Sequence, residues 1–291
     1  AIHLFMKQKN HKALAGLVAL AAVFAATQAH AAPPYFQGFE DPLFAPNTEP
    51  GDFDNFGYDG TIERVLSNQG KAGVASKSGD AHGQINYIDT NAGHDVSVTT
   101  RFGGFSSSFG DGFKTSVDIF LDTAWASETG FDFSSAASKQ DGKHLRDFIW
   151  HVGMDGTNLK VNASNGTNYN FNADRLTPNN GPVPFTVTNS GWYTFENVFR
   201  DDGGALAVDF NLRKDDGSLL TTFTRSNPSD LINSIVGGNR YGWFTFNNID
   251  GLAIDNVSAV PEPGVYLGMA FALGLFGYRR FKARAKSDAA A

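Results

Sequence analysis

The chain has 291 residues, no cysteine and a formal net charge of −7, with 41% hydrophobic and 18% charged residues. This composition predicts a packed globular body, and it excludes general disorder, a disulfide framework, a thiolate zinc site and a cysteine nucleophile. The acidic balance also argues against a nucleic-acid partner, because binding to phosphates requires a basic surface.

Residues 1–31 are typical of a secretory signal peptide preceded by a few upstream residues. Lysines after Met6 precede a short apolar run over residues 13–26, and Ala29 and Ala31 form a small-residue A-x-A cleavage site. An ordinary helix is the alternative, but the run is only about half the length that spans a bilayer. The segment therefore predicts export, with cleavage after Ala31.

Residues 32–260 predict one all-β domain, a two-sheet antiparallel β-sandwich. Short segments rich in Phe, Thr and Val are broken every 8 to 12 residues or so by Gly, Asn or Asp. The segment 113–122 alternates apolar and polar residues, as a strand with one buried face does. Residues 192–225 predict a three-stranded antiparallel meander, because Asp-Gly turns at 201–204 and 214–217 join its segments.

The rest of this domain follows the same pattern. Further strands are predicted at 61–66, 84–88, 96–102, 145–152, 158–163, 184–188, 240–246 and 252–259. One short helix is predicted over residues 229–235, because a serine opens it as an N-cap. No Pro-rich or low-complexity linker divides the body, so a single domain is expected.

The two edges of the body resemble a known type of domain. Residues 38–41 and 253–258 are similar to the first and last strands of jelly-roll carbohydrate-binding modules and related concanavalin A-like sandwiches. This resemblance implies a structural calcium ion held by Glu40 and Asp255, because Ca²⁺ takes oxygen ligands from separate segments. Ordinary strand-end carboxylates without a metal are the alternative.

A second acidic cluster has part of the spacing of a calcium-binding loop. Asp52, Asp54 and Glu63 occupy ligand positions of such a loop, but Phe56 stands where a further oxygen ligand is needed, and no helix flanks it. We interpret these residues as turn formers.

The body lacks the usual catalytic patterns. A glycoside hydrolase on such a sandwich needs two facing carboxylates, and no two glutamates of the body lie within five residues of each other. The histidines of the body are interpreted as surface or loop residues: His82, His94, His144 and His151. His144 and His151 are seven residues apart, an odd step that predicts opposite faces of any single strand. The sequence therefore predicts a protein that is not an enzyme.

Aromatic residues suggest a binding surface instead. Tyr241 and Trp243 share one face of a predicted strand, and Trp192 lies beside Thr194 and Glu196 on the more polar face of another. Flat rings next to polar groups are what a sugar-stacking site requires. Glycan binding by these three rings is the hypothesis, and packing in the core is the alternative for each.

Residues 261–291 form a three-part tail. Pro261, Glu262 and Pro263 precede an uncharged apolar stretch at 265–278, and a basic cluster closes the tail: Arg279, Arg280, Lys282 and Arg284. This order resembles the PEP-CTERM sorting domain of exported proteins of Gram-negative bacteria. A simple single-span anchor is the alternative.

The resemblance of the tail implies a location and partners. It implies recognition by an exosortase at the Pro-Glu-Pro motif, transient anchorage in the inner membrane through a short transmembrane helix, and release toward an outer surface rich in extracellular polysaccharide.

Three functions of the chain remain as alternatives. The first is an exported, non-catalytic protein that binds matrix polysaccharide. The second is a glycoside hydrolase or lyase whose carboxylate pair comes from separate strands, and the third is a passive structural surface protein.

Overall fold

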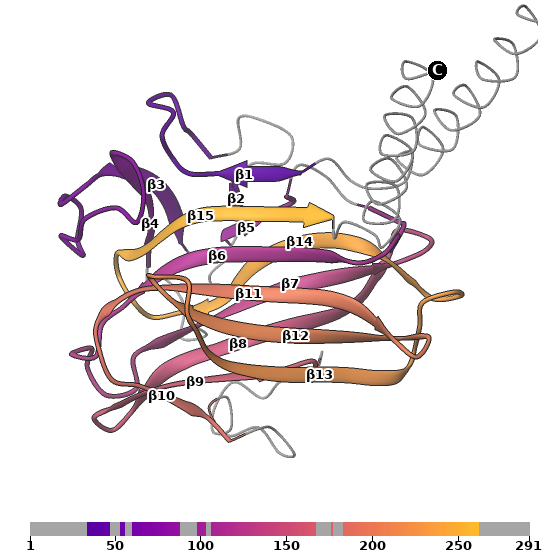
Figure 1. Cartoon of the computed structure of the whole chain (residues 1–291). Coiled ribbons are helices and arrows are strands. Elements are labelled where there is room, and N and C mark those ends of the chain that lie inside the picture. Colours follow the sequence, from indigo (N-terminus) through magenta and orange to yellow (C-terminus); the bar gives the residue numbers. More distant parts are fainter. Residues whose placement is uncertain are drawn as a thin grey trace, which may run out of the picture. The chain divides into compact units, whose positions relative to one another are not determined.

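The structure, a computed structural model, describes residues 34–46, 53–55, 60–87, 98–102, 106–166, 176 and 183–261. The regular elements of these residues are all β-strands (Figure 1). Their bounds are β1 Tyr35–Gln37, β2 Phe53–Asn55, β3 Thr61–Leu66, β4 Ala81–Asn86, β5 Val98–Thr100, β6 Phe113–Leu121, β7 Gly130–Lys139, β8 His144–Asp155, β9 Asn158–Ser164, β10 Phe185–Val187, β11 Gly191–Asp202, β12 Ala205–Lys214, β13 Leu219–Leu231, β14 Val236–Asn247 and β15 Leu252–Pro261.

The strands form two antiparallel sheets. The eight-stranded sheet has the order β13-β12-β11-β6-β15-β4-β3, with β1 paired to β15, and the seven-stranded sheet has the order β10-β9-β8-β7-β14-β5-β2. In Figure 1 the strands β6, β11, β12 and β13 of the first sheet lie in front of β7, β8 and β9 of the second. Pairs such as β6 with β15 and β7 with β14 join distant parts of the sequence, so the body folds as one all-β sandwich.

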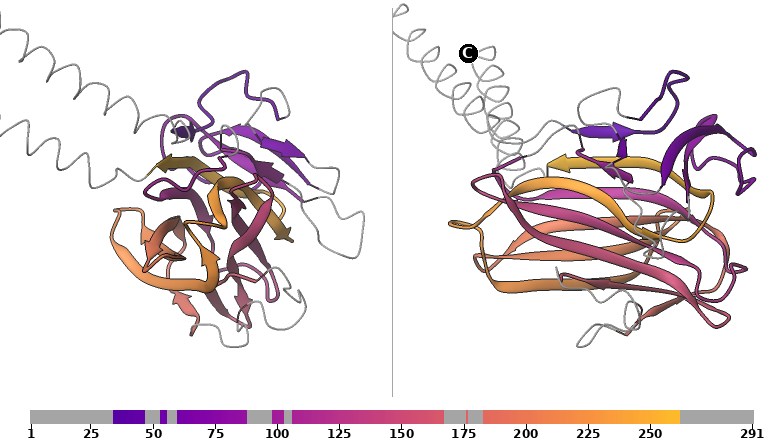
Figure 2. Two further views of the ribbon diagram at one scale, coloured as in Figure 1. Left: turned by 90° about the vertical axis from the view of Figure 1, so that its right-hand side faces the viewer. Right: turned by 180° about the vertical axis from the view of Figure 1, so that it is seen from behind.

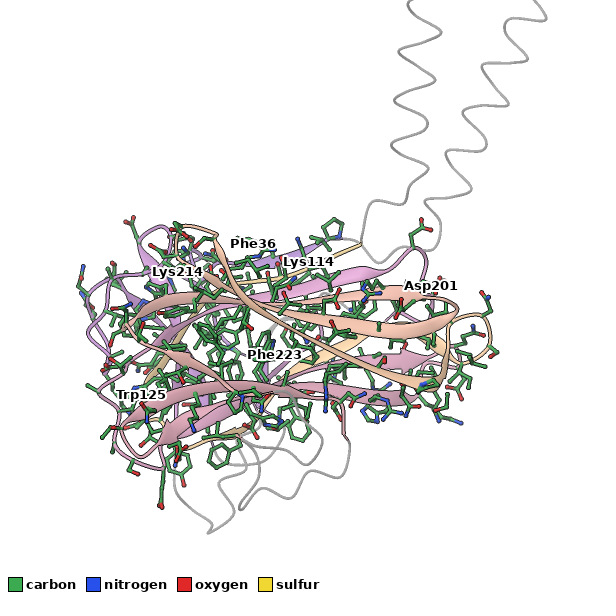
Figure 3. The ribbon with its side chains drawn as sticks, turned by 60° about the horizontal axis from the view of Figure 1, so that its bottom comes forward. Phe36, Lys114, Trp125, Asp201, Lys214 and Phe223 are labelled. Atoms are coloured by element: carbon green, nitrogen blue, oxygen red, sulfur yellow. The ribbon has the colours of Figure 1, made fainter. Side chains whose placement is uncertain are left out.

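An aromatic core fills the space between the sheets. Trp150 of the seven-stranded sheet is fully buried, and its ring meets Phe195 and Phe210 of the other sheet edge to face at 5.1 Å. Its Nε1 donates a hydrogen bond to Oδ1 of Asn197 at 2.5 Å, so the polar end of the indole is paired. Figure 3 shows Phe223 in the same interior. This core fixes which face of each sheet points outward.

The predicted strand at 113–122 and the predicted meander are confirmed. Strand β6 buries its alternate apolar residues, and β11, β12 and β13 pair in sequence as antiparallel neighbours. The turn between β11 and β12 places Gly203 and Gly204 at φ values of 67° and 94°, a region that favours glycine. Asp201 and Lys214 mark opposite ends of this meander in Figure 3.

Three local predictions are wrong. The helix at 229–235 is absent, because β13 continues to Leu231, which pairs with Ala205 and so satisfies the backbone as a strand. The first strand is Tyr35–Gln37, not 38–41, although it pairs with β15 as first and last strands of such sandwiches do. The central strand β7 was not predicted at all, because its second half consists of small residues with little strand preference.

The predicted signal and tail helices lie outside the described residues. Within the described part of the chain, no helix is long and apolar enough to cross a bilayer. The described body ends at Pro261, whose backbone closes β15 opposite Phe113.

Candidate functional site

The outer face of the seven-stranded sheet carries two of the predicted aromatic residues. In the register of β7 and β14, Trp243 stands opposite Ser134 and Tyr241 opposite Ala136. Directly opposed residues of an antiparallel pair share a face. Phe133 and Phe244 also stand opposite each other and belong to the core, so Tyr241 and Trp243 point away from it. The right-hand view of Figure 2 has this sheet toward the viewer.

Asp147 of β8 lies at the centre of a polar cluster on this face. Its carboxylate accepts hydrogen bonds from Ser134 Oγ at 2.8 Å, from His144 Nε2 at 2.9 Å and from the Tyr241 hydroxyl at 3.4 Å. The Asp147 side chain is 15% exposed and that of His144 is 34% exposed. The cluster is therefore fixed by its own hydrogen bonds and still accessible from solvent.

The aromatic rings pack against this cluster. The rings of His144 and Tyr241 are parallel, with centroids 6.1 Å apart, and the rings of Tyr241 and Trp243 meet edge to face at 6.3 Å. Burial, and then the charge of Asp147, raise the pKa of Tyr241 well above its ordinary value. Its hydroxyl therefore stays protonated at neutral pH and remains a hydrogen-bond donor. We name Ser134, His144, Asp147, Tyr241 and Trp243 the aromatic cluster.

Trp192 is not part of this cluster. It belongs to β11 of the eight-stranded sheet, opposite Phe120, and its Nε1 donates a hydrogen bond to the Ala75 carbonyl at 2.8 Å. Its ring meets those of Phe120 and His82 edge to face. Tyr241 and Trp243 lie on the other sheet. The three rings expected to form one glycan platform are thus divided between two sheets.

The histidines differ from the sequence interpretation. His82 and His151 are fully buried within strands, and burial lowers the pKa of His82. His144 and His151 were expected on opposite faces of a strand, yet both lie on the outer face of β8. The reason is a register shift between β7 and β8, from Ala137 opposite Arg146 to Ser138 opposite His144, which inserts one extra residue.

The predicted calcium ligands Glu40 and Asp255 lie close together. The Asp255 carboxylate accepts a hydrogen bond from the Ser78 backbone N–H at 3.1 Å, and that of Glu40 accepts hydrogen bonds from the N–H of Asp80 at 3.1 and 3.2 Å. Burial, and then the nearby charges of Asp118 and Glu40, raise the pKa of Asp255 to about 6. The segment Ser78 to Asp80 thus joins the two carboxylates.

No cluster of three or more His, Asp or Glu residues suited to a metal ion occurs in the described part of the chain. Of the second acidic cluster, Asp52 and Phe56 lie outside the described residues, while Asp54 belongs to β2 and Glu63 to β3. Glu63 accepts hydrogen bonds from the amides of Gln84 and Asn86 at 2.8 and 2.6 Å.

The outer face also bears on the hydrolase alternative. Asp132 of β7 stands opposite His151 of β8, and Asp147 precedes His151 by four residues. Given a rise of about 3.3 Å per residue and a strand spacing of about 4.8 Å, the two backbones are on the order of 14 Å apart. Glycosidase carboxylates are separated by about 5 to 10 Å. Asp132 and Asp147 therefore do not form such a pair.

Most of the predicted sorting residues lie outside the described part of the chain. These are Ala29, Ala31, Glu262, Pro263, Arg279, Arg280, Lys282 and Arg284. Pro261 is the last described residue, at the end of β15.

No protein-family model matches the chain, and no curated protein matches it in sequence. Three solved structures illustrate what it is similar to. A carbohydrate esterase from the Shiga toxin-encoding bacteriophage phi24B is 14% identical over 78% of this chain and 95% of that chain, with a TM-score of 0.47. The CBM2 module of the evolved Dit of Lactobacillus casei BL23 phage J-1 is 12% identical over 77% and 93%, with a TM-score of 0.39. Winged bean acidic lectin, complexed with methyl-α-D-galactose, is 13% identical over 78% and 98%, with a TM-score of 0.33. At these identities and scores the similarity assigns no role to this chain.

Proposed function

We propose that this chain binds polysaccharide through the aromatic cluster on the outer face of the seven-stranded sheet. The observation that carries the proposal is the pair of half-buried rings, Tyr241 and Trp243, beside the Asp147 carboxylate. An aromatic ring stacks on the apolar face of a sugar, and a carboxylate held by its own hydrogen bonds accepts hydrogen bonds from sugar hydroxyls. The two rings meet edge to face, so one of them can stack on a sugar while the other borders it.

We propose that the body is a jelly-roll, concanavalin A-like sandwich and that it does not cleave glycosidic bonds. The separation of Asp132 and Asp147 supports that role, because it exceeds the distance at which two carboxylates act on one glycosidic bond. Affinity electrophoresis through gels that contain neutral or acidic bacterial exopolysaccharides tests the binding. Retarded migration in at least one gel is expected. Unchanged migration in every gel would favour the passive structural role.

We further propose that the chain is exported, processed by an exosortase and released at the outer surface of a Gram-negative bacterium. The proposal rests on the order of basic start, A-x-A site, Pro-Glu-Pro motif and basic cluster in the sequence. The intact mass of the exported product is expected to lack residues 1–31 and the basic tail. Recovery of peptides that contain Arg279 and Arg284 from that product would contradict processing.

A further inference from the structure

A second group of polar side chains lies on the same outer face, beside the aromatic cluster. Asp132, His151 and Ser164 come from the adjacent strands β7, β8 and β9, and are 1%, 0% and 4% exposed. His151 Nδ1 is 3.0 Å from Oδ1 of Asp132, and its Nε2 is 2.8 Å from Oγ of Ser164. The imidazole thus bridges a carboxylate and a hydroxyl in the order that a serine nucleophile requires.

The position of each residue follows from the register. Asp132 stands directly opposite His151, and His151 stands opposite Asn162, two residues before Ser164. All three side chains therefore project from one face of three adjacent strands. Ser164 is the last residue of β9, so its hydroxyl lies where the chain leaves the sheet, next to the half-exposed Asn165.

The two contacts define the protonation of the ring. The carboxylate beside Nδ1 favours a proton on that nitrogen, which leaves the lone pair of Nε2 directed at the Ser164 hydroxyl. The Asp132 carboxylate oxygen lies 3.0 Å from Nδ1, close enough for its charge to stabilise the imidazolium that forms when Nε2 takes up a proton. A buried carboxylate and imidazole on a sheet face also cost folding stability compared with apolar residues of the same size.

We propose that Ser164, His151 and Asp132 form a nucleophilic site that hydrolyses carboxylic esters. For the substrate class we propose O-acyl groups on polysaccharide, and this assignment of the substrate rests on the proposed function. Ser164 stands in the same cross-strand row as Ile149, Ser134 and Trp243. Three strand spacings separate Ser164 from Trp243, about 14 Å. The proposed esterase site and the aromatic cluster therefore lie on the same sheet face, joined by the buried side chains of Ile149 and Ser134.

The reaction balances with water as the co-substrate. Ser164 Oγ forms a bond to the acyl carbon while its proton passes to His151 Nε2, and Asp132 balances the charge of the imidazolium. The bond between the acyl carbon and the sugar oxygen breaks, and this oxygen takes the proton from Nε2. Water then attacks the acyl-serine with His151 as the base, which releases the carboxylic acid and restores the hydroxyl. The site adds a catalytic activity that the sequence did not predict.

A fluorophosphonate probe tests the site in the unmodified chain. The probe forms a bond from phosphorus to the nucleophilic oxygen and loses fluoride, so peptide mass spectrometry identifies the residue that reacted. We expect the adduct on Ser164, and we expect turnover of p-nitrophenyl acetate that falls roughly 10²-fold or more in Ser164→Ala and His151→Asn. Ser116→Ala is the matched control, because Ser116 lies in the eight-stranded sheet, away from the proposed site. Its hydroxyl is hydrogen-bonded to that of Ser258 in the same sheet at 2.8 Å. This variant is expected to retain both signals.

Absence of an adduct on Ser164 in the unmodified chain would overturn the site, whether or not the variants fold. Turnover that persists in a folded Ser164→Ala variant would overturn it too. Glycan binding, the proposed function, is tested separately by affinity electrophoresis in polysaccharide gels. A chain that is labelled at Ser164 but is not retarded by polysaccharide would keep the esterase and refute glycan binding.

Discussion

Asp147 holds His144 through a hydrogen bond of 2.9 Å from Nε2, while His144 lies parallel to the ring of Tyr241. The carboxylate thereby fixes the orientation of the imidazole, and through a second contact, at 3.4 Å, that of the Tyr241 hydroxyl. One acidic side chain thus organises the polar border of the proposed sugar-binding surface. A change at Asp147 is expected to affect binding without a change to either aromatic ring.

Asp147→Asn tests this organising role. The amide has one acceptor oxygen in place of two, so it cannot accept hydrogen bonds from both His144 and Ser134. We expect the affinity for polysaccharide to fall about threefold to tenfold, equivalent to roughly 1 kcal/mol, measured by affinity electrophoresis. Asp202→Asn, at an exposed position of the other sheet, is the control and is expected to bind normally. Equal retardation of both variants would show that Asp147 does not take part.

Core packing predicts a contrasting behaviour for Trp150. Trp150→Ala removes a fully buried ring and leaves the Asn197 amide oxygen without the indole donor. We expect the free energy of unfolding to fall by about 3 to 5 kcal/mol, as is usual for large-to-small changes in a core. Urea unfolding of this variant beside the unmodified chain measures the difference. A loss below about 1 kcal/mol would be inconsistent with the aromatic core described above.

The raised pKa of Asp255 predicts a pH dependence of stability. The folded carboxyl titrates at about 6, above its ordinary value of 3.8, so the folded state binds this proton more tightly than the unfolded state does. Protonation of Asp255 therefore stabilises the folded state. This stabilisation is complete below pH 3.8 and is lost as the pH rises through about 6. In calcium-free buffer the melting temperature of the unmodified chain is expected to fall between pH 5 and pH 7. The Asp255→Asn variant should lack this fall in melting temperature between pH 5 and pH 7. The same dependence of melting temperature on pH in both proteins would refute the role of Asp255.

Bound calcium would offset the loss of stability at pH 7 if Glu40 and Asp255 hold the ion. Binding to the folded state alone adds about 2.7 kcal/mol at a calcium concentration one hundred times Kd. We expect a chelator to lower the melting temperature at pH 7 by several degrees, and added calcium to restore it. The Glu40→Gln variant should not respond. If melting is unaffected by both chelator and calcium in the unmodified chain, the two carboxylates are not a metal site.

The sequence predicted the fold class and much of the strand pattern, because alternation marks strands with one buried face. Strand β6 and the β11–β12–β13 meander follow it closely. The central strand β7 escaped prediction because Ser134, Ser135, Ala136 and Ala137 have little intrinsic strand preference. Pairing on both sides, to β8 and β14, keeps this segment extended.

The candidate site was only partly predictable. Tyr241 and Trp243 are two residues apart, and this spacing correctly predicts a shared face. Trp192 could not be assigned to the other sheet, because sheet membership depends on long-range pairing that local sequence does not encode. The shared face of His144 and His151 depends on the bulge in β8, and a bulge breaks the two-residue period on which the prediction relied.

The central claim is that the aromatic cluster binds polysaccharide, and paired tryptophan variants test it most directly. Trp243→Ala and Trp192→Ala each remove a half-buried indole, one from each sheet, so they match in the change but differ in location. Both are compared with the unmodified chain by affinity electrophoresis in exopolysaccharide gels, beside thermal melts. We predict that Trp243→Ala weakens retention several-fold to tenfold, about 1 kcal/mol, while Trp192→Ala leaves it unchanged. Unchanged retention in a folded Trp243→Ala variant would contradict the account.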